Sequence, residues 1–194
     1  MNALSLNKED ALLLIIDIQE KLIPTMDAAR LDKVVSQIGL LSLYASKEGL
    51  PVIMTEQYSK GLGKTIPSVM KHVNGINYEY FDKTSFGCMG DEKFTAMLKE
   101  KYPQKKIIVT GMETHICVYL TVLGLREEGF AVFVPQDAVI AHDYKLHENG
   151  LQLMDNAGAT ITNSESLVFQ LMGSSGGETF KAVSGYLKAQ SSSV

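Results

Sequence analysis

Long hydrophobic runs, basic runs and a cysteine framework are all missing from this sequence. No apolar run approaches the ~18 residues that a membrane span requires, so no membrane-spanning segment is expected. The net charge is −4 and the pI is near 5.6, without a dense Lys/Arg run, which argues against nucleic acid or an anionic membrane as partner. The two cysteines, Cys88 and Cys117, cannot form a disulfide framework, so a reducing compartment is expected. These absences favour a protein that acts on a small molecule.

The length of 194 residues suits one domain with a full hydrophobic core, which we expect to cover residues 1–194. Its hydrophobic fraction of 45% and charged fraction of 21% are ordinary for a folded protein. The ten residues before Ala11 are acidic as well as basic and leave little room for a signal or transit peptide. We therefore expect a cytoplasmic protein, with mitochondrial association left open.

Short aliphatic runs recur along the chain and lack the apolar/polar alternation of a sheet with one wet face. Such runs are typical of strands that are buried on both faces, as in a parallel sheet. The expected strands are Ala11–Ile16, Pro51–Met54, Tyr78–Phe81, Ile107–Val109, Ala131–Val134 and Ala159–Ile161.

Stretches with helical periodicity separate several of these strands. Leu31–Lys47, Cys117–Glu128 and Tyr144–Asn156 are the clear helices, and a glycine follows each one before the next strand. Strand–helix–strand repetition predicts parallel strands joined by right-handed crossovers, which gives a three-layer α/β fold. Thr55–Asn77 shows little periodicity, and we expect a long loop there, with a turn of helix at most, that covers a site.

Three side chains that could take part in catalysis come at or near the ends of expected strands. Ligands of parallel sheets bind at these ends. Asp17 directly follows the first strand, where a carboxylate is costly to bury unless it is paired or functional. The plain alternative for Asp17 is a cap of the next helix. Lys83 alone is a surface lysine, and Cys117 alone is a buried small apolar residue.

Together, these three side chains make a nucleophile, a base and an electrostatic stabiliser. A free thiol with a pKa near 8.5 is only ~3% ionised at neutral pH. A helix N-terminus lowers that pKa by less than about one unit, whereas a nearby ammonium lowers it by ~1–3 units. A carboxylate disfavours the resting thiolate but accepts its proton during attack. We therefore expect the three side chains to meet in one cleft, where the Lys83 ammonium makes the Cys117 sulfur anionic.

Rival motifs give weaker signals. Gly63-Lys64-Thr65 is similar to the end of a phosphate-binding loop, but that motif needs glycine where this chain has Tyr58. The four histidines lack the HxH or HxxxH spacing of a metal site. His115 lies two residues before Cys117, so on a helix the two side chains would point about 200° apart. We expect no metal and no cofactor.

Four motifs in order resemble the isochorismatase-like cysteine hydrolases, over nearly the whole chain from Leu12 to about Lys188. The resemblance is closest to the eukaryotic isochorismatase domain-containing proteins. The motifs are LIIDIQE at Leu14–Glu20, FDKTSF at Phe81–Phe86, VTGMETHICV at Val109–Val118 and TNSESLVFQL at Thr162–Leu171.

This resemblance implies a Rossmann-like, three-layer αβα sandwich with a six-stranded parallel sheet. It also implies that Cys117 is the nucleophile, Asp17 the general base and Lys83 the group that stabilises the ionised pair. A cis peptide bond is implied between Met112 and Glu113, which would aim the backbone N–H groups of Glu113 and Cys117 at a developing oxyanion. Attack on an amide-like carbonyl would give a thioester, which water would then hydrolyse.

Two departures from other branches of the family narrow the expected reaction. Nicotinamidases hold a metal with an Asp/His cluster after the second strand, whereas Thr55–Gly61 here contains no histidine. True isochorismatases lack the cysteine that this chain has at position 117. The sequence therefore predicts a metal-independent cysteine hydrolase that acts on an amide or related C–N bond of a small molecule.

Two further expectations follow from the resemblance. The alternative function is a non-catalytic or redox-responsive scaffold of the same fold, in which Cys88 is either structural or a thiol that modifies Cys117 under oxidation. Relatives form dimers and larger assemblies, so we expect a homo-oligomer, at least a dimer.

Overall fold

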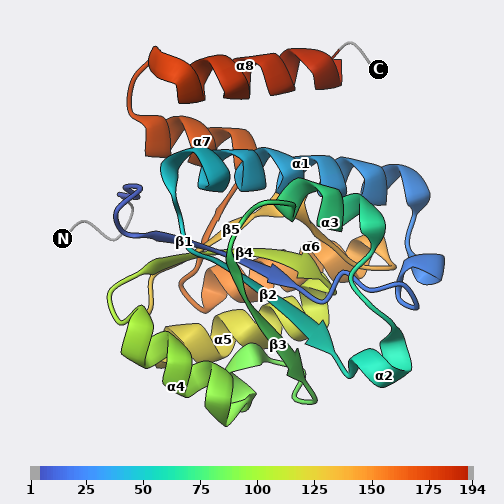
Figure 1. Cartoon of the computed structure of the whole chain (residues 1–194). Coiled ribbons are helices and arrows are strands. Elements are labelled where there is room, and N and C mark those ends of the chain that lie inside the picture. Colours follow the sequence, from blue (N-terminus) through green and yellow to red (C-terminus); the bar gives the residue numbers. More distant parts are fainter. Residues whose placement is uncertain (1–4, 192–194) are drawn as a thin grey trace.

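A parallel β-sheet forms the middle layer of the computed structural model, which describes residues 5–191 (Figure 1). Its strands lie in the order β3-β2-β1-β4-β5-β7, and the two-residue strand β6 pairs with β4. The sheet thus contains the six expected strands and one more, which is too short to be recognised from sequence. The strands are β1 (Ala11–Ile16), β2 (Val52–Gln57), β3 (Tyr78–Lys83), β4 (Lys106–Met112), β5 (Val132–Pro135), β6 (Val139–Ile140) and β7 (Thr160–Thr162).

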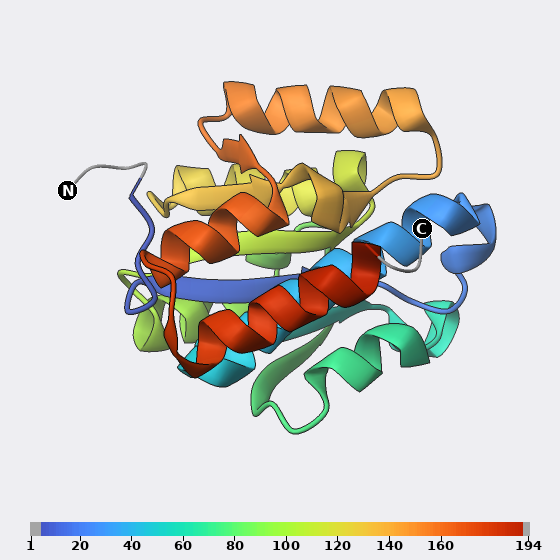
Figure 2. The same ribbon diagram turned by 90° about the horizontal axis from the view of Figure 1, so that it is seen from above.

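Helices cover both faces of the sheet and complete three layers. Helices α1, α3 and α7 pack on one face and α4, α5 and α6 on the other, while α8 lies outside α1 (Figures 1 and 2). No helix within residues 5–191 has the length and apolarity that crossing a membrane requires. The helices are α1 (Ala28–Glu48), α2 (Ser59–Leu62), α3 (Pro67–Val73), α4 (Glu92–Lys101), α5 (Tyr119–Glu127), α6 (Tyr144–Asn156), α7 (Ser164–Met172) and α8 (Gly177–Ser191); the short turns are η1 (Ile23–Thr25), η2 (Cys88–Gly90), the π-helical η3 (Thr114–Val118) and η4 (Gln136–Ala138).

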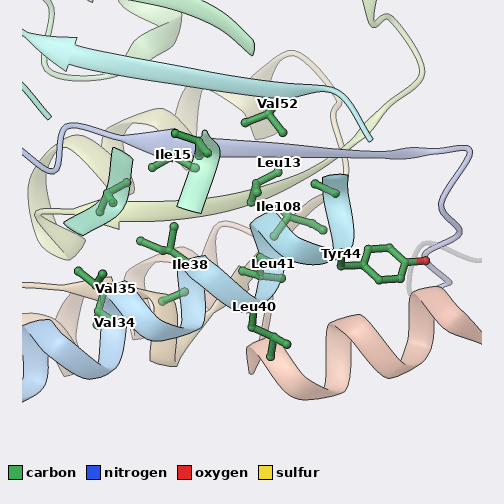
Figure 3. Packing of buried hydrophobic residues seen from close by; sticks show 14 of the residues in the cluster. Leu13, Ile15, Val34, Val35, Ile38, Leu40, Leu41, Tyr44, Val52 and Ile108 are labelled. Atoms are coloured by element: carbon green, nitrogen blue, oxygen red, sulfur yellow. The ribbon is translucent and has the colours of Figure 1, made fainter. Parts of the chain in front are cut away.

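Strand β1 lies in the centre of the hydrophobic core, and every one of its residues is buried. Leu13 and Ile15 join the cluster under α1, whereas their neighbours on the strand join the cluster under α5 (Figure 3). Because successive side chains of a strand point to opposite faces, a strand that is covered on both sides must be apolar throughout. This explains the uninterrupted run ALLLII.

Helix α1 forms where the sequence predicts it and supplies most of one core face. Its buried positions include Val34, Val35 and Ile38, which face the sheet in Figure 3. The Asp27 side chain accepts a hydrogen bond from the Arg30 N–H at 2.8 Å and caps the start of the helix. Gly49, in the left-handed region at φ +68°, ends it.

The segment Thr55–Asn77 contains more regular structure than the expected loop with a turn of helix. Strand β2 continues to Gln57, and two short helices, α2 and α3, follow it. Pro67 begins α3, because its fixed φ suits the first turn of a helix. Helices α2 and α3 are too short to show a helical periodicity in the sequence. Helices α4, α7 and α8 were not predicted either.

The chain reverses its direction of travel across the sheet between β1 and β4. It proceeds from β1 outward to β3 and then returns to place β4 on the other side of β1. Ligands of open α/β sheets bind at this kind of switch point, beyond the carboxyl ends of the strands. Asp17 follows β1 here, and η3 follows β4.

Strands β1 and β4 approach so closely at this point that only glycine fits at position 111. Gly111 pairs with Ile16 and has φ +119°. A Cβ atom at Gly111 would lie 2.0 Å from the Ile16 carbonyl oxygen, which belongs to backbone and cannot move aside. Asp17 directly follows Ile16, so its position depends on the glycine at position 111.

We expect Gly111→Ala to lower the free energy of unfolding by at least ~3 kcal/mol, because it combines a forbidden φ with a backbone clash. Gly49→Ala is the matched control, since φ is also positive there but a Cβ meets nothing within 4 Å. The control should cost only about 1 kcal/mol. Urea unfolding of both variants measures the difference, and equal losses would contradict the close approach.

Candidate active site

The Asp17 carboxylate is fully buried at the end of β1. Its backbone has φ +52°, which is unusual for a residue other than glycine. The Asp17 N–H donates to the Thr55 carbonyl at 3.1 Å, and Oδ1 accepts from the Thr55 hydroxyl at 2.7 Å. Asp27, not Asp17, caps the following α-helix, so the simple capping role considered for Asp17 is wrong.

Lys83 is the last residue of β3, and its ammonium group is buried against Asp17. Nζ donates to Asp17 Oδ2 at 2.6 Å and to Gln57 Oε1 at 2.9 Å. The carbonyl oxygens of Ser85 and Phe86 lie 3.2 and 3.0 Å away and complete the surroundings. With a side chain that is 0% exposed, Lys83 is not a surface lysine. Such a charge is tolerated inside a protein only when it is paired and hydrogen-bonded.

Hydrogen bonds from Gln19 and Thr84 hold Gln57, one of the residues that accept from the Lys83 ammonium. The Gln57 N–H donates to Gln19 Oε1 at 2.7 Å, and Gln19 Nε2 donates back to the Gln57 carbonyl at 3.0 Å. Gln57 Nε2 bonds to the Thr84 carbonyl at 2.8 Å, so its Oε1 is turned toward Lys83. Neither glutamine was expected from the sequence, although Gln57 ends β2 and Gln19 lies three positions past the end of β1.

Cys117 lies in the π-helical turn η3, two residues before α5. The sequence predicted that the α-helix would begin at Cys117. The Val118 N–H donates to the Glu113 carbonyl five residues back, at 3.2 Å, which is the pattern of a π-helix. The Thr121 hydroxyl accepts from the Cys88 N–H and donates to the Cys117 carbonyl at 2.6 Å. Cys117 lies close enough to Asp17 for the carboxylate to raise the pKa of its thiol.

The electrostatics at Cys117 differ from the expectation. Burial is the largest cause that raises the pKa of the Cys117 thiol to about 12; Asp17 raises it further and Lys83 lowers it. Burial also raises the pKa of Asp17, against the attraction of Lys83. The raised pKa is opposite to the expectation that the Lys83 ammonium makes the sulfur anionic, and it agrees with the expectation that a nearby carboxylate disfavours the resting thiolate. Lys83 already compensates Asp17, and a pair of zero net charge does not offset the desolvation of the sulfur.

The backbone before Cys117 changes direction at Met112–Glu113, where the peptide bond is cis. This is the position at which the family resemblance places such a bond. Glu113 and Cys117, the two residues expected to supply oxyanion N–H donors, stand before and within the same π-helical turn. The Glu113 carboxylate is directed elsewhere, toward His142, which donates to it from Nδ1 at 2.6 Å.

Cys88 is fully buried beside this site, and burial raises its pKa to about 12. A neutral, enclosed thiol of this kind is unreactive in the resting protein. The structure therefore gives Cys88 a packing role in η2, and its suggested redox role stays a prediction.

The end of β2 and the residues after it correspond to the metal-binding segment of nicotinamidases, and here the Glu56 carboxylate is occupied by protein contacts. Glu56 accepts hydrogen bonds from the Thr65 N–H at 2.8 Å and from the Tyr80 hydroxyl at 2.6 Å. Lys64 pairs with the same carboxylate at 3.1 Å. These contacts fasten the α2–α3 segment to the sheet. In the part of the chain that the structure describes, the grouping of metal-ligating side chains lies elsewhere, at Glu113, His115 and His142.

Comparisons with known proteins identify relatives over most of the chain. The isochorismatase domain matches residues 11–166. Isochorismatase family protein 1B of Dictyostelium discoideum is 32% identical, covering 90% of this chain and 84% of that protein. Isochorismatase domain-containing protein 2 of Xenopus laevis is 30% identical, covering 92% and 83% respectively.

Solved structures with the same fold include three of particular interest. The MAR1 ribonuclease of Caenorhabditis elegans has a TM-score of 0.84 and 31% identity, covering 94% of this chain and 92% of its own. YcaC of Pseudomonas aeruginosa, determined with hexane-2,5-diol and covalent acrylamide, has a TM-score of 0.85 and 25% identity over 99% and 98%. YcaC of Escherichia coli, described as an octameric hydrolase of unknown specificity, has a TM-score of 0.81 and 24% identity over 97% and 96%.

The raised pKa of the Cys117 thiol predicts how its rate of alkylation depends on pH. With a pKa of about 12, the thiolate fraction rises about tenfold per pH unit below that value. We expect the rate of iodoacetamide labelling to climb steadily from pH 7 to pH 10, as measured by intact mass. Cys117→Ser identifies the labelled residue, because Cys88 is enclosed. A rate that levels off below pH 8 would show a resting thiolate instead.

Proposed function

The chain belongs to the isochorismatase family, and we propose that it is a cysteine hydrolase that cleaves an amide or related C–N bond of a small molecule. The observation that carries this proposal is the buried Asp17–Lys83 pair, hydrogen-bonded at 2.6 Å, with the carboxylate close enough to Cys117 to raise the pKa of its thiol. A nucleophile beside a base that is itself held by a third group is the arrangement that covalent catalysis requires.

In the proposed first step, Cys117 Sγ attacks the carbonyl carbon while its proton passes to the Asp17 carboxylate. A C–S bond forms and the carbonyl π-electrons move to oxygen, where the N–H groups of Glu113 and Cys117 stabilise the negative charge. Collapse of this intermediate breaks the C–N bond. Asp17 returns the proton to the departing nitrogen, which leaves a thioester on Cys117.

Water completes the cycle in the proposed second step. Asp17 accepts a proton from water as its oxygen attacks the thioester carbonyl, and the C–S bond then breaks. The proton returns to sulfur, so the free acid leaves and the resting thiol is restored. No step requires a metal ion.

The raised pKa of Asp17 suits this role. Burial makes the carboxylate a stronger proton acceptor than an exposed one, which narrows the gap to the thiol's pKa of about 12. Lys83 keeps the carboxylate ionised and oriented, since a carboxyl that was already protonated could not act as a base. The balance between burial and pairing thus sets the strength of the base.

One relative supports a reactive nucleophile in this fold. P. aeruginosa YcaC is known with covalent acrylamide, an electrophile whose alkene carbon is attacked by nucleophiles while its amide bond stays intact. RNA is a second class to consider, because the C. elegans structure is that of a ribonuclease. We place RNA second for this chain, since a net charge of −4 is unfavourable for binding a polyanion.

We expect incubation with acrylamide to add one acrylamide mass to Cys117, and small primary amides or carbamoyl compounds that are substrates to leave a transient acyl mass there. Intact and peptide mass spectrometry measures both. Cys117→Ala should lose the adducts and all amide turnover, because no other group can form the thioester. Cys88→Ala is the matched control and should retain the label.

The outcomes also separate the alternatives. Amide hydrolysis that persists in Cys117→Ala would refute the cysteine mechanism. Cleavage of a fluorescent RNA by the wild type but not by Cys117→Ala would place the chain with the ribonuclease. No adduct and no turnover of either class would favour a scaffold that uses the fold for partner binding.

We also infer that the chain assembles as a homo-oligomer. Phe86 is 60% and Leu120 is 37% exposed, and together with Met89 and Leu123 they line a shallow apolar hollow. Exposed apolar clusters of this kind mark interaction surfaces. The E. coli relative described as an octamer shares the fold.

Sedimentation velocity should therefore show a species of at least twice 21.3 kDa. Phe86→Lys should shift the distribution toward smaller species, because it places a charge in the apolar contact. Phe169→Lys is the control, since Phe169 is 42% exposed on α7, outside this hollow. A single 21.3-kDa species for the wild type would contradict assembly.

A further inference from the structure

Two histidines and a glutamate come together near η3, the turn that carries Cys117. Glu113 follows β4, His115 lies in η3, and His142 follows β6. One potential ligand atom from each of these residues lies within 4.8 Å of the others. Their separation along the chain explains why histidine spacing gave no sign of the group: the third member comes from a different strand.

His115 has a ring nitrogen that the fold does not satisfy. Its Nδ1 atom is buried, and no hydrogen-bond partner reaches it in the described part of the chain. Leaving a buried polar atom unpaired costs about 1–3 kcal/mol. The His142 ring stands edge-on to that of His115, with 5.5 Å between the ring centres. A ligand that reached Nδ1 of His115 would relieve this unpaired nitrogen.

Glu113 and His142 already form a polar pair with access to solvent. Glu113 Oε2 accepts from the His142 N–H at 2.9 Å and from its Nδ1 at 2.6 Å. The two side chains are 15% and 43% exposed, so a cation can reach them from water. A cation bound by both groups would take the place of the proton that they share.

We propose that Glu113, His115 and His142 form a binding site for a divalent transition-metal ion of the zinc type. Imidazole nitrogen with one carboxylate is a donor set that Zn²⁺ favours, whereas Ca²⁺ and Mg²⁺ require mainly oxygen. Three protein ligands leave a fourth position for water or a small ligand. The site uses the Glu113 side chain and not the thiol, so metal binding can be measured separately from the proposed hydrolase chemistry.

The geometry requires only a small adjustment. Bonds of ~2.0–2.1 Å at tetrahedral angles place ligand atoms about 3.3 Å apart. Glu113 Oε2 and His142 Nδ1, at 2.6 Å, must therefore separate by less than about 1 Å, and the His115 nitrogen, within 4.8 Å of them, must approach by up to about 1.5 Å. His142 can make this movement because its ring is partly in solvent.

The test is calorimetric titration of zinc chloride into the full-length protein, prepared without a polyhistidine tag and stripped with a chelator that is then removed. We expect one zinc ion per chain. His142→Ala, at a half-exposed position that folding tolerates, should weaken binding at least about tenfold. His115→Gln tests the buried ligand. His72→Gln on α3 is the matched control and should bind as the wild type does.

Cobalt(II) titration distinguishes this site from the thiols. A histidine–carboxylate site gives cobalt bands without the intense sulfur-to-metal charge-transfer absorption of a thiolate ligand, and Cys117→Ser should leave the spectrum unchanged. Absence of zinc binding by the wild type would overturn the proposal. So would binding that survives His142→Ala and His115→Gln, or binding that is lost in Cys117→Ser. Each readout is independent of enzymatic turnover.

Discussion

The buried ion pair between Asp17 and Lys83 is the interaction on which the rest of the site depends. It joins the end of β1 to the end of β3 across β2, and neither side chain touches solvent. Removing one partner of such a pair leaves a lone buried charge and costs about 3–5 kcal/mol. The hydroxyl of Thr55 and the amide of Gln57 are therefore part of the same unit, because they satisfy what the pair leaves open.

The pair also determines the resting state of the nucleophile. An isolated ammonium beside Cys117 would favour the thiolate, but this ammonium is compensated by a carboxylate at 2.6 Å. Burial then prevails, and the pKa of the thiol rises to about 12. In the proposed mechanism, this neutral sulfur becomes strongly nucleophilic only as its proton moves to Asp17.

The sequence was sufficient for the parts of the molecule that follow from local pattern. Apolar runs located the strands, and the residues after them included Asp17, Lys83 and Cys117. It was insufficient where the outcome depends on contacts between distant segments. The state of the Cys117 thiol depends on how one ammonium divides its attraction between two partners, and Gln19 meets Gln57 only through the crossover between β1 and β2. The short helices α2 and α3 are held by tertiary contacts such as that of Glu56 with Thr65.

Glu113 connects the π-helical turn to the segment after β6. Its carbonyl accepts hydrogen bonds from the turn that holds Cys117, whereas its carboxylate bonds to His142 in the segment after β6. A change in the partner of that carboxylate acts on the same residue whose N–H is assigned to the oxyanion. An ion on Glu113, His115 and His142 would fix this residue more firmly than the present pair of hydrogen bonds does, because metal–ligand bonds restrict the carboxylate in three directions. The metal group and the thiol are thus chemically separate but mechanically joined through one residue.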